Sequence, residues 1–240
     1  MSNYRPISIL PILSMIMERE VQTQLVDYFV KHDLINIDQF AFLKHHSTVT
    51  CLHRLLDDWY EAINEGEYVF SSFFDIKKCF DMIDHKLLIE KMSKYGICDD
   101  ALSWFSNYLS DRSQVVHCNG ETSERKDIFT GVPQGSALGP LLFLIFVNDF
   151  PQALSEASSN FFADDCATYV SGRSFVETSQ KLQTAITESA EWYRNNKLPL
   201  CTDKSFHFIS SSERRLTNIP DYPQILLNNE NLKREMISPY

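Results

Sequence analysis

The order of helical and strand-like patterns along the 240 residues predicts an α+β fold. Two amphipathic helical patterns come first, over residues 17–29 and 52–63, and strands then alternate with helices. Hydrophobic residues make up 44% of the chain and charged residues 22%, which is ordinary for a folded globular protein. The longest apolar stretch, residues 140–147, is far shorter than the roughly 20 residues of a membrane-spanning helix, so we expect no membrane contact.

The helices are predicted from apolar spacing and from end signals. Met17, Val21 and Leu25 recur at helical intervals and continue to Tyr28 or Phe29. The second helix has Ser47 or Thr48 as its N-cap and Gly66 as its stop. By the same reasoning we expect further helices at residues 84–96, 100–108, 140–148 and 174–196.

The strands are predicted from short apolar runs and turn signals. Residues 68–76 are rich in aromatic side chains and too short for a helix, so they indicate a buried strand. Asn119-Gly120 is the strongest hairpin signal, and we expect it to join strands at residues 115–118 and 126–129. Residues 161–170 indicate two short strands around an acidic turn, and residues 206–210 a last strand.

Cysteine usage and net charge exclude some classes of protein. No C-x-x-C occurs, which argues against a cysteine-based zinc cluster and a dense disulfide framework and favours reduced thiols inside a cell. The net charge of -10 is unlike that of a free-standing nucleic-acid binder, which normally carries a basic excess. The six cysteines are Cys51, Cys79, Cys98, Cys118, Cys166 and Cys201.

One of three Asp-Asp pairs stands out. Asp57-Asp58 fits the solvated face of a helix, and Asp99-Asp100 fits a helix start, where carboxylates favour the macrodipole. The third pair, at residues 164–165, lies between apolar segments in FFADDCATYV. Two like charges in a partly buried place are costly unless a cation neutralises them. The alternative is a polar turn that uses aspartates only for backbone hydrogen bonds.

A second acidic position makes a metal site the stronger interpretation. Asp75 ends the aromatic strand in FFDIKKCFD, where the pattern predicts an apolar residue. One carboxylate from a strand end and a pair from a neighbouring hairpin form an oxygen-rich site suited to Mg²⁺. Such sites hold two metals about 4 Å apart and drive in-line phosphoryl transfer, with little covalent work left for side chains.

Glycine is concentrated in one segment. The chain has seven glycines, and three of them, Gly131, Gly135 and Gly139, lie in GVPQGSALGP before an apolar helix. This clustering indicates that backbone passes close to something, such as a base pair or a sugar. A tight turn into the helix is the other explanation.

The order of these features closely resembles the reverse transcriptase domain of non-long-terminal-repeat retrotransposons, of the LINE-like jockey/CR type. Asp75 is followed by GVPQGSALGP and then by FADD, as in that family, and the likeness continues to about Phe208. Flanking segments agree with it: NYRPISIL (3–10), DQFAFLKHHST (38–48), DHKLL (84–88), YGI (95–97) and LFLIFVNDF (142–150).

The resemblance implies the fingers and palm of a right-handed polymerase, with an antiparallel palm sheet backed by helices and no thumb. ILLNNENL at residues 225–232 is similar to the strand pair that leads to the primer grip, so we expect the chain to be truncated before the primer grip and thumb. The implied division is fingers (1–66), palm with the first catalytic strand (67–94), a fingers-type insertion (95–128), palm (129–215) and the lead-in to the primer grip (216–240).

The resemblance also implies roles for nine residues. Asp75, Asp164 and Asp165 match the catalytic and metal-binding triad. Phe80 matches the aromatic residue that rejects a 2′-hydroxyl, and a core aromatic is the alternative. The remaining matches are Gln134 and Gly135 near template and nucleotide, Arg5 facing nucleic acid or in a surface salt bridge, Lys204 near the leaving pyrophosphate or simply solvated, and Lys44 near the triphosphate.

Several positions depart from the family pattern. Ala41 and Leu43 stand where Gly and Arg are usual, and a leucine cannot grip a triphosphate through charge-assisted hydrogen bonds. Lys44 is the nearby substitute, as a point charge without a planar fork. Cys201 and Ser205 replace the usual Asn and Thr.

The function implied is RNA-directed DNA polymerase activity in retrotransposition. The expected cofactor is Mg²⁺, with Mn²⁺ as a substitute, and the expected partners are an RNA template, a DNA primer and deoxynucleoside triphosphates. A catalytically inactive remnant that binds nucleic acid or protein is the alternative, favoured by Leu43 and the acidic charge. We expect an intracellular protein, in nucleus or cytoplasm, and the family implies nuclear action.

Overall fold

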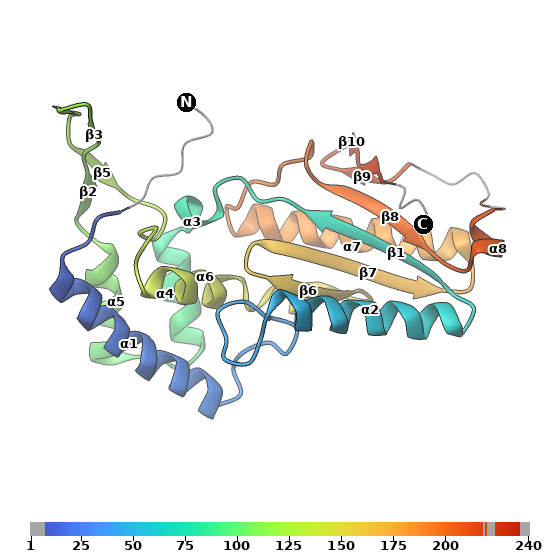
Figure 1. Cartoon of the computed structure of the whole chain (residues 1–240), viewed down its shortest axis with the longest axis horizontal. Coiled ribbons are helices and arrows are strands. Elements are labelled where there is room, and N and C mark those ends of the chain that lie inside the picture. Colours follow the sequence, from blue (N-terminus) through green and yellow to red (C-terminus); the bar gives the residue numbers. More distant parts are fainter. Residues whose placement is uncertain (1–7, 218, 220–223, 236–240) are drawn as a thin grey trace. The chain divides into compact units, whose positions relative to one another are not determined.

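The computed structural model describes residues 8–217, 219 and 224–235, and its internal contacts divide the chain into two compact units. The first unit contains Met1–Ile35 and Lys78–Val147, and the second contains Asn36–Lys77 and Asn148–Tyr240. Each unit is therefore assembled from two separated stretches of sequence. Helices combined with a mainly antiparallel sheet confirm the predicted α+β class (Figure 1).

The second unit is centred on a five-stranded sheet with the strand order β11-β8-β1-β7-β6 (Figure 1). The central strand β1 runs antiparallel to both β7 and β8, whereas the edge strand β11 runs parallel to β8. The strands are β1 (Tyr68–Phe74), β6 (Ser158–Phe162), β7 (Asp165–Gly172), β8 (Phe206–Ser210) and β11 (Lys233–Arg234). The strands predicted at residues 68–76, 161–170 and 206–210 are thus confirmed, with small changes at their ends.

Helices cover both faces of this sheet. On one face α7 (Phe175–Asn195) packs on β1, and Phe70 and Phe175 bring their ring centroids within 5.0 Å. On the other face α2 (Thr48–Asn64) inserts Trp59, whose ring lies 4.9 Å from that of Phe208. Since successive side chains of a strand point to opposite faces, this explains why five of the seven residues of β1 are buried.

The second unit begins with a loop that covers the edge of the sheet. The Phe40 backbone N–H donates to the Phe161 carbonyl at 3.0 Å, and the Phe161 N–H donates to the Asp38 carbonyl at 2.9 Å. These two hydrogen bonds satisfy the outer edge of β6 at Phe161 without another strand.

Ser47 caps α2 in a capping box with Thr50, which confirms one of the two predicted N-caps.

Shorter elements complete the second unit. They are η1 (Phe150–Ala153), α8 (Glu213–Leu216), β9 (Leu226–Leu227) and β10 (Glu230–Asn231). Strands β9 and β10 pair antiparallel, as expected for the strand pair in ILLNNENL.

The first unit is built around an apolar helix, α6 (Leu138–Val147), in which nine of the ten residues are buried. A Glu18 carboxylate oxygen accepts the Ala137 N–H at 2.8 Å, just before the helix begins. At its other end Lys91 donates to the Phe146 carbonyl at 2.8 Å. A carboxylate at the N-terminus and an ammonium at the C-terminus both complement the helix macrodipole and stabilise α6.

Three other helices of this unit match predicted segments: α1 (Ile12–Lys31), α4 (His85–Lys94) and α5 (Asp99–Leu109). The short helix α3 (Cys79–Met82) was not predicted. Asp84 caps α4 as expected, and α1 begins five residues before the predicted start.

The buried face of α1 differs from the predicted one. Leu25 and Phe29 are buried as expected, but Met17 is 53% exposed and Glu18 is only 2% exposed. Glu18 is turned inward because its two carboxylate oxygens accept hydrogen bonds from Ala137 and from the Tyr108 hydroxyl. A polar anchor therefore overrode the apolar spacing.

The predicted hairpin has the right turn and different strand pairing. Asn119-Gly120 joins β3 (His117–Cys118) to β4 (Glu121–Thr122). The strand expected to pair with 115–118 is β5 (Lys126–Ile128), and it pairs instead with β2 (Arg112–Gln114). Ser123 breaks the ladder, because its N–H and hydroxyl both bond to the Val116 backbone.

Among the described helices none has the length and hydropathy needed to span a bilayer.

Candidate active site

Two of the predicted carboxylates leave adjacent strands at the same end of the sheet. Phe74 is the last residue of β1 to pair with β7, and its partner is Cys166. Asp75 follows Phe74 in sequence, and Asp165 precedes Cys166 in the antiparallel neighbour. Both side chains therefore start one step beyond the last pair of this ladder.

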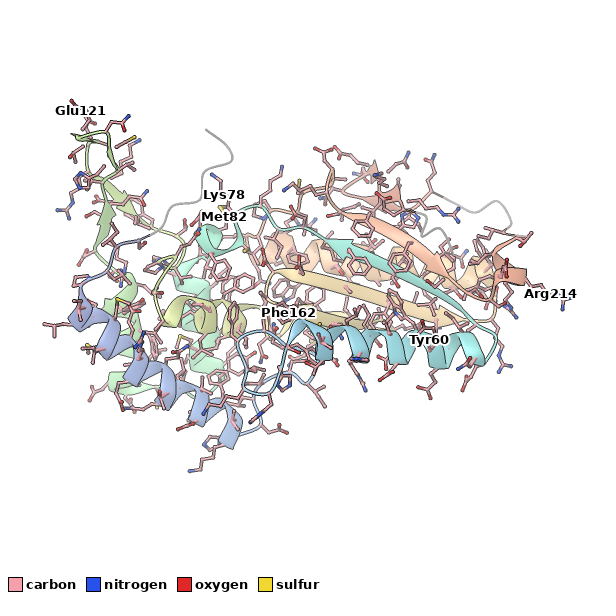
Figure 2. The ribbon with its side chains drawn as sticks, in the orientation of Figure 1. Tyr60, Lys78, Met82, Glu121, Phe162 and Arg214 are labelled. Atoms are coloured by element: carbon pink, nitrogen blue, oxygen red, sulfur yellow. The ribbon has the colours of Figure 1, made fainter. Side chains whose placement is uncertain are left out.

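The third carboxylate lies in the turn between β6 and β7. Phe162 pairs with Asp165, so Ala163 and Asp164 form a two-residue turn, and Phe162 marks the turn end of the hairpin in Figure 2. Ala163 adopts a φ of 57°, a left-handed conformation that costs an L-residue other than glycine about 1–2 kcal/mol. The predicted acidic hairpin is confirmed, and strain of this kind is concentrated at functional turns.

Electrostatic repulsion is concentrated at Asp165. Burial raises the pKa of this carboxyl, and the neighbouring charges of Asp164 and Asp75 raise it further. The Cys51 thiol in the first turn of α2 has its pKa raised to about 11, by burial and by the charge of Asp165. The strand end therefore carries excess negative charge that a bound cation would relieve.

The backbone of Asp75 is held by the segment before β8. Its N–H donates to the Ser205 hydroxyl oxygen at 3.2 Å, and its carbonyl accepts the Cys201 N–H at 2.8 Å. The Ser205 hydroxyl in turn donates to the Cys201 carbonyl at 2.9 Å. Ser205, which stands where a threonine was expected, thus supplies a hydroxyl group as a threonine would.

Lys204 lies beside the same carboxylate. Its Nζ is 3.7 Å from Asp75 Oδ2, and the two side chains are 70% and 40% exposed. The structure therefore brings Lys204 to the predicted acidic site, where it forms a solvent-accessible ion pair.

Lys44 lies in the loop that precedes α2. It is exposed, and its carbonyl accepts a hydrogen bond from the His46 ring at 2.9 Å. Ala41, at the position where the family has Gly, is only 1% exposed, so its methyl group is part of the core. Leu43 is half-buried.

The other predicted nucleotide-contacting residues lie together in the first unit. Phe80 is partly exposed in α3, and its ring centroid is 4.9 Å from that of Phe143 in α6. In Figure 2 the labels Lys78 and Met82 mark the residue before this helix and its last residue. The Gln134 amide donates to an Asp81 carboxylate oxygen at 2.7 Å. Gly135 is exposed next to it, with a φ of 102°.

Two of the three clustered glycines are explained by the protein itself. A Cβ at Gly131, where φ is 85°, would lie 2.7 Å from backbone atoms of Asp81. A Cβ at Gly139 would lie 2.8 Å from Ser136 Oγ and 3.0 Å from the Pro133 carbonyl oxygen. Close packing within the protein thus accounts for Gly131 and Gly139, and a close approach to a base or sugar stays a prediction for this segment.

Of the predicted site residues, Arg5 lies outside the described residues. The sequence analysis missed Asp81, although it ends the motif FFDIKKCFD, because a carboxylate that holds a glutamine has no spacing signal of its own.

The donor set suits a hard divalent cation, since Asp75 and Asp165 supply carboxylate oxygens from adjacent strands and repel each other. Within residues 8–217, 219 and 224–235, no three His, Cys, Asp or Glu side chains are gathered closely enough to hold a metal. The residues present thus fit such an ion by the chemistry of their carboxylates.

Comparison with known proteins identifies the family. Residues 1–220 match the family described as "Reverse transcriptase (RNA-dependent DNA polymerase)". The fold and the strand-end carboxylates agree with this class of nucleotide polymerase. The chain belongs to the reverse transcriptase family.

The curated relatives include proteins of non-long-terminal-repeat retrotransposons of Drosophila melanogaster. The chain is 34% identical over 203 residues to "Probable RNA-directed DNA polymerase from transposon BS", covering 79% of this chain and 22% of the relative. It is 31% identical over 209 residues to "RNA-directed DNA polymerase from mobile element jockey", covering 84% and 23%. The predicted resemblance is confirmed, and the chain spans about a fifth of the length of these relatives.

A solved structure supports the fold. Telomerase from Candida tropicalis, in complex with a fragment of telomeric RNA, superposes with a TM-score of 0.62 at 15% identity. The match covers 84% of this chain and 34% of the telomerase chain. This likeness is consistent with the predicted polymerase fingers and palm.

Proposed function

We propose that this chain is the catalytic part of an RNA-directed DNA polymerase. It extends a primer 3′-hydroxyl with deoxynucleoside triphosphates and copies an RNA template. One observation carries the proposal. In a member of the reverse transcriptase family, Asp75 and Asp165 leave adjacent strands at one end of a sheet, and Asp164 lies in the turn between β6 and β7.

The three carboxylates are the proposed metal ligands. Mg²⁺ held by Asp75, Asp164 and Asp165, with Mn²⁺ as a substitute, would neutralise charge on the reacting phosphates and lower the pKa of the primer hydroxyl. The contacts from Ser205 and Cys201 fix the backbone of Asp75, and the β6–β7 pairing fixes that of Asp165. Positioned charge of this kind is the main protein contribution to phosphoryl transfer.

The remaining roles follow the family pattern. Phe80 is the proposed barrier to a 2′-hydroxyl, and Gln134 and Gly135 are proposed to contact template and incoming nucleotide. Lys204 is proposed to assist the leaving pyrophosphate, which its place beside Asp75 supports. Lys44 and Arg5 are proposed to meet nucleic-acid or triphosphate charge.

The larger assignments also belong to the proposal. Residues 1–66 and 95–128 are proposed as fingers, residues 67–94 and 129–215 as palm, and residues 216–240 as the lead-in to the primer grip. The relatives act in transposons, and the telomerase neighbour carries RNA, which supports nucleic acid as the partner. Copying RNA onto genomic DNA would place the action in the nucleus.

Primer extension tests this function directly. Purified chain is incubated with poly(rA)·oligo(dT), thymidine triphosphate and Mg²⁺ or Mn²⁺, and the products are resolved by length. We expect extension that the Asp164→Asn variant loses by at least about a hundredfold, since positioned charge at a reacting centre contributes on that scale.

The control separates loss of a ligand from loss of fold. Asp57→Asn removes one exposed carboxylate from α2 in the same unit, and it should extend primers as the parent chain does. Extension that survives Asp164→Asn unchanged would sink the proposal.

A further inference from the structure

A buried amide lies behind the acidic hairpin. Asn160 in β6 is 3% exposed, and within the described part of the chain its Nδ2 has no hydrogen-bond partner. Burying an amide with an unpaired N–H is costly, and an apolar side chain would avoid the cost in a buried strand. Core packing alone therefore does not explain why an asparagine occupies this position.

The amide oxygen of Asn160 is held from α2. The Cys51 thiol donates to Asn160 Oδ1 at 2.7 Å, and its Sγ also lies 3.7 Å from the Phe161 carbonyl oxygen. Cys51 is half-buried and lies in the first capped turn of the helix. One side chain of α2 thus contacts two successive residues of β6.

This contact is close to the carboxylates along the strand. Asn160 pairs with Ala167, and two residues further on Phe162 pairs with Asp165. Because alternate residues of a strand share a face, Asn160 and Phe162 point to the same side of the sheet, with Ala167 and Asp165 beside them. A shift of β6 against α2 therefore moves the turn that carries Asp164.

We propose that Cys51 and Asn160 are positioning residues. They fix β6 against α2, so that the hairpin turn holds Asp164 and Asp165 where a metal ion can bind. The inference rests on the proposed function, because it assigns a purpose to those carboxylates. It is the counterpart of the outer contacts that orient metal ligands in other proteins.

Binding of Mn²⁺ to the whole chain, measured by isothermal titration calorimetry, tests the inference without relying on activity. Cys51→Ala and Asn160→Leu should each weaken the affinity about tenfold, the scale on which outer contacts act. Cys51→Ser keeps a donor and should stay within about twofold of the parent chain.

A matched control excludes a general loss of packing. Leu56→Ala trims a partly buried side chain further along the same helix than Cys51, and should lower the melting temperature while leaving Mn²⁺ affinity unchanged. Parent-like affinity in Cys51→Ala and Asn160→Leu, or an equal loss in Leu56→Ala, overturns the positioning role. If the parent chain binds no Mn²⁺, or binds it no more tightly than the Asp164→Asn variant does, the proposed metal site is overturned and this inference with it.

Discussion

Lys204 Nζ lies 3.7 Å from Asp75 Oδ2, at the end of β1, the strand that precedes Asp75. An ammonium group there offsets part of the repulsion that raises the pKa of Asp165. A cation that binds Asp75 would be repelled by this ammonium group. Lys204 therefore competes with a metal ion for the Asp75 carboxylate.

Removing this ammonium should improve cation binding. The Lys204→Gln variant loses a competitor for Asp75, and since exposed ion pairs contribute up to about 1 kcal/mol, we expect Mn²⁺ affinity to rise about two- to fivefold. Calorimetric titration measures the change. Lys181→Gln is the matched control, because it removes an exposed ion pair with Glu156 elsewhere in the same unit. Weaker Mn²⁺ binding in Lys204→Gln would contradict the competition.

Asp165 should make the chain less stable as pH rises when a chelator keeps metal away. The pKa of Asp165 is raised in the folded chain above its value of 3.8 in the unfolded chain. At a pH between the unfolded and the folded pKa, the folded chain therefore binds more protons than the unfolded chain. The free energy of unfolding then falls as pH rises through that window and stays lower at neutral pH. The Asp165→Asn variant should therefore be the more stable one at pH 7, and the difference should vanish below the unfolded pKa.

The gain is small because Asp165 is more than a third exposed. Solvent screening keeps it below about 1 kcal/mol, or a rise of about 2–4 °C in melting temperature at most. Thermal melts of both chains in chelator between pH 3 and 7 measure it, and adding Mn²⁺ should reverse the order. A variant that melts lower than the parent at pH 7 in chelator would show that repulsion is not the dominant effect.

The sequence predicted the elements whose physics is local. Ser47 caps α2 and Asp84 caps α4 because a side-chain oxygen near its own helix start needs no distant partner. The apolar runs on either side of the acidic pair in FFADDCATYV likewise predicted both strands and the turn at Asp164. Aspartates at apolar positions were the signal that pointed to the candidate site.

Contacts between distant segments could not be read in this way. The apolar spacing of α1 gave no sign that Glu18 is buried, because its donors, Ala137 and Tyr108, come from far along the chain. The Cys51–Asn160 contact joins residues 109 positions apart. Such polar pairs depend on packing that no single segment of sequence encodes.

Gly131 should tolerate no side chain. Its φ of 85° and the 2.7 Å separation between an added methyl carbon and Asp81 act together, so Gly131→Ala should lower the free energy of unfolding by about 2–4 kcal/mol. Gly120→Ala is the matched control, since its φ is 84° and nothing lies within 4 Å of the added carbon. That variant should lose only about 1 kcal/mol. Urea unfolding compares them, and equal losses would contradict the clash.

Phe80 should decide between deoxyribonucleotides and ribonucleotides. It is partly exposed, whereas Phe143, on which it packs, is fully buried. A barrier to a 2′-hydroxyl requires bulk at the surface, so Phe80→Val should raise ribonucleotide use relative to deoxyribonucleotide use by at least about tenfold. The ratio of kcat/KM for the two triphosphates in primer extension measures this. Phe143→Leu removes the buried ring of the same aromatic pair. This variant should have a lower free energy of unfolding and an unchanged ratio of ribonucleotide to deoxyribonucleotide use. If Phe80→Val also leaves the ratio unchanged, Phe80 is a core aromatic residue that supports α6.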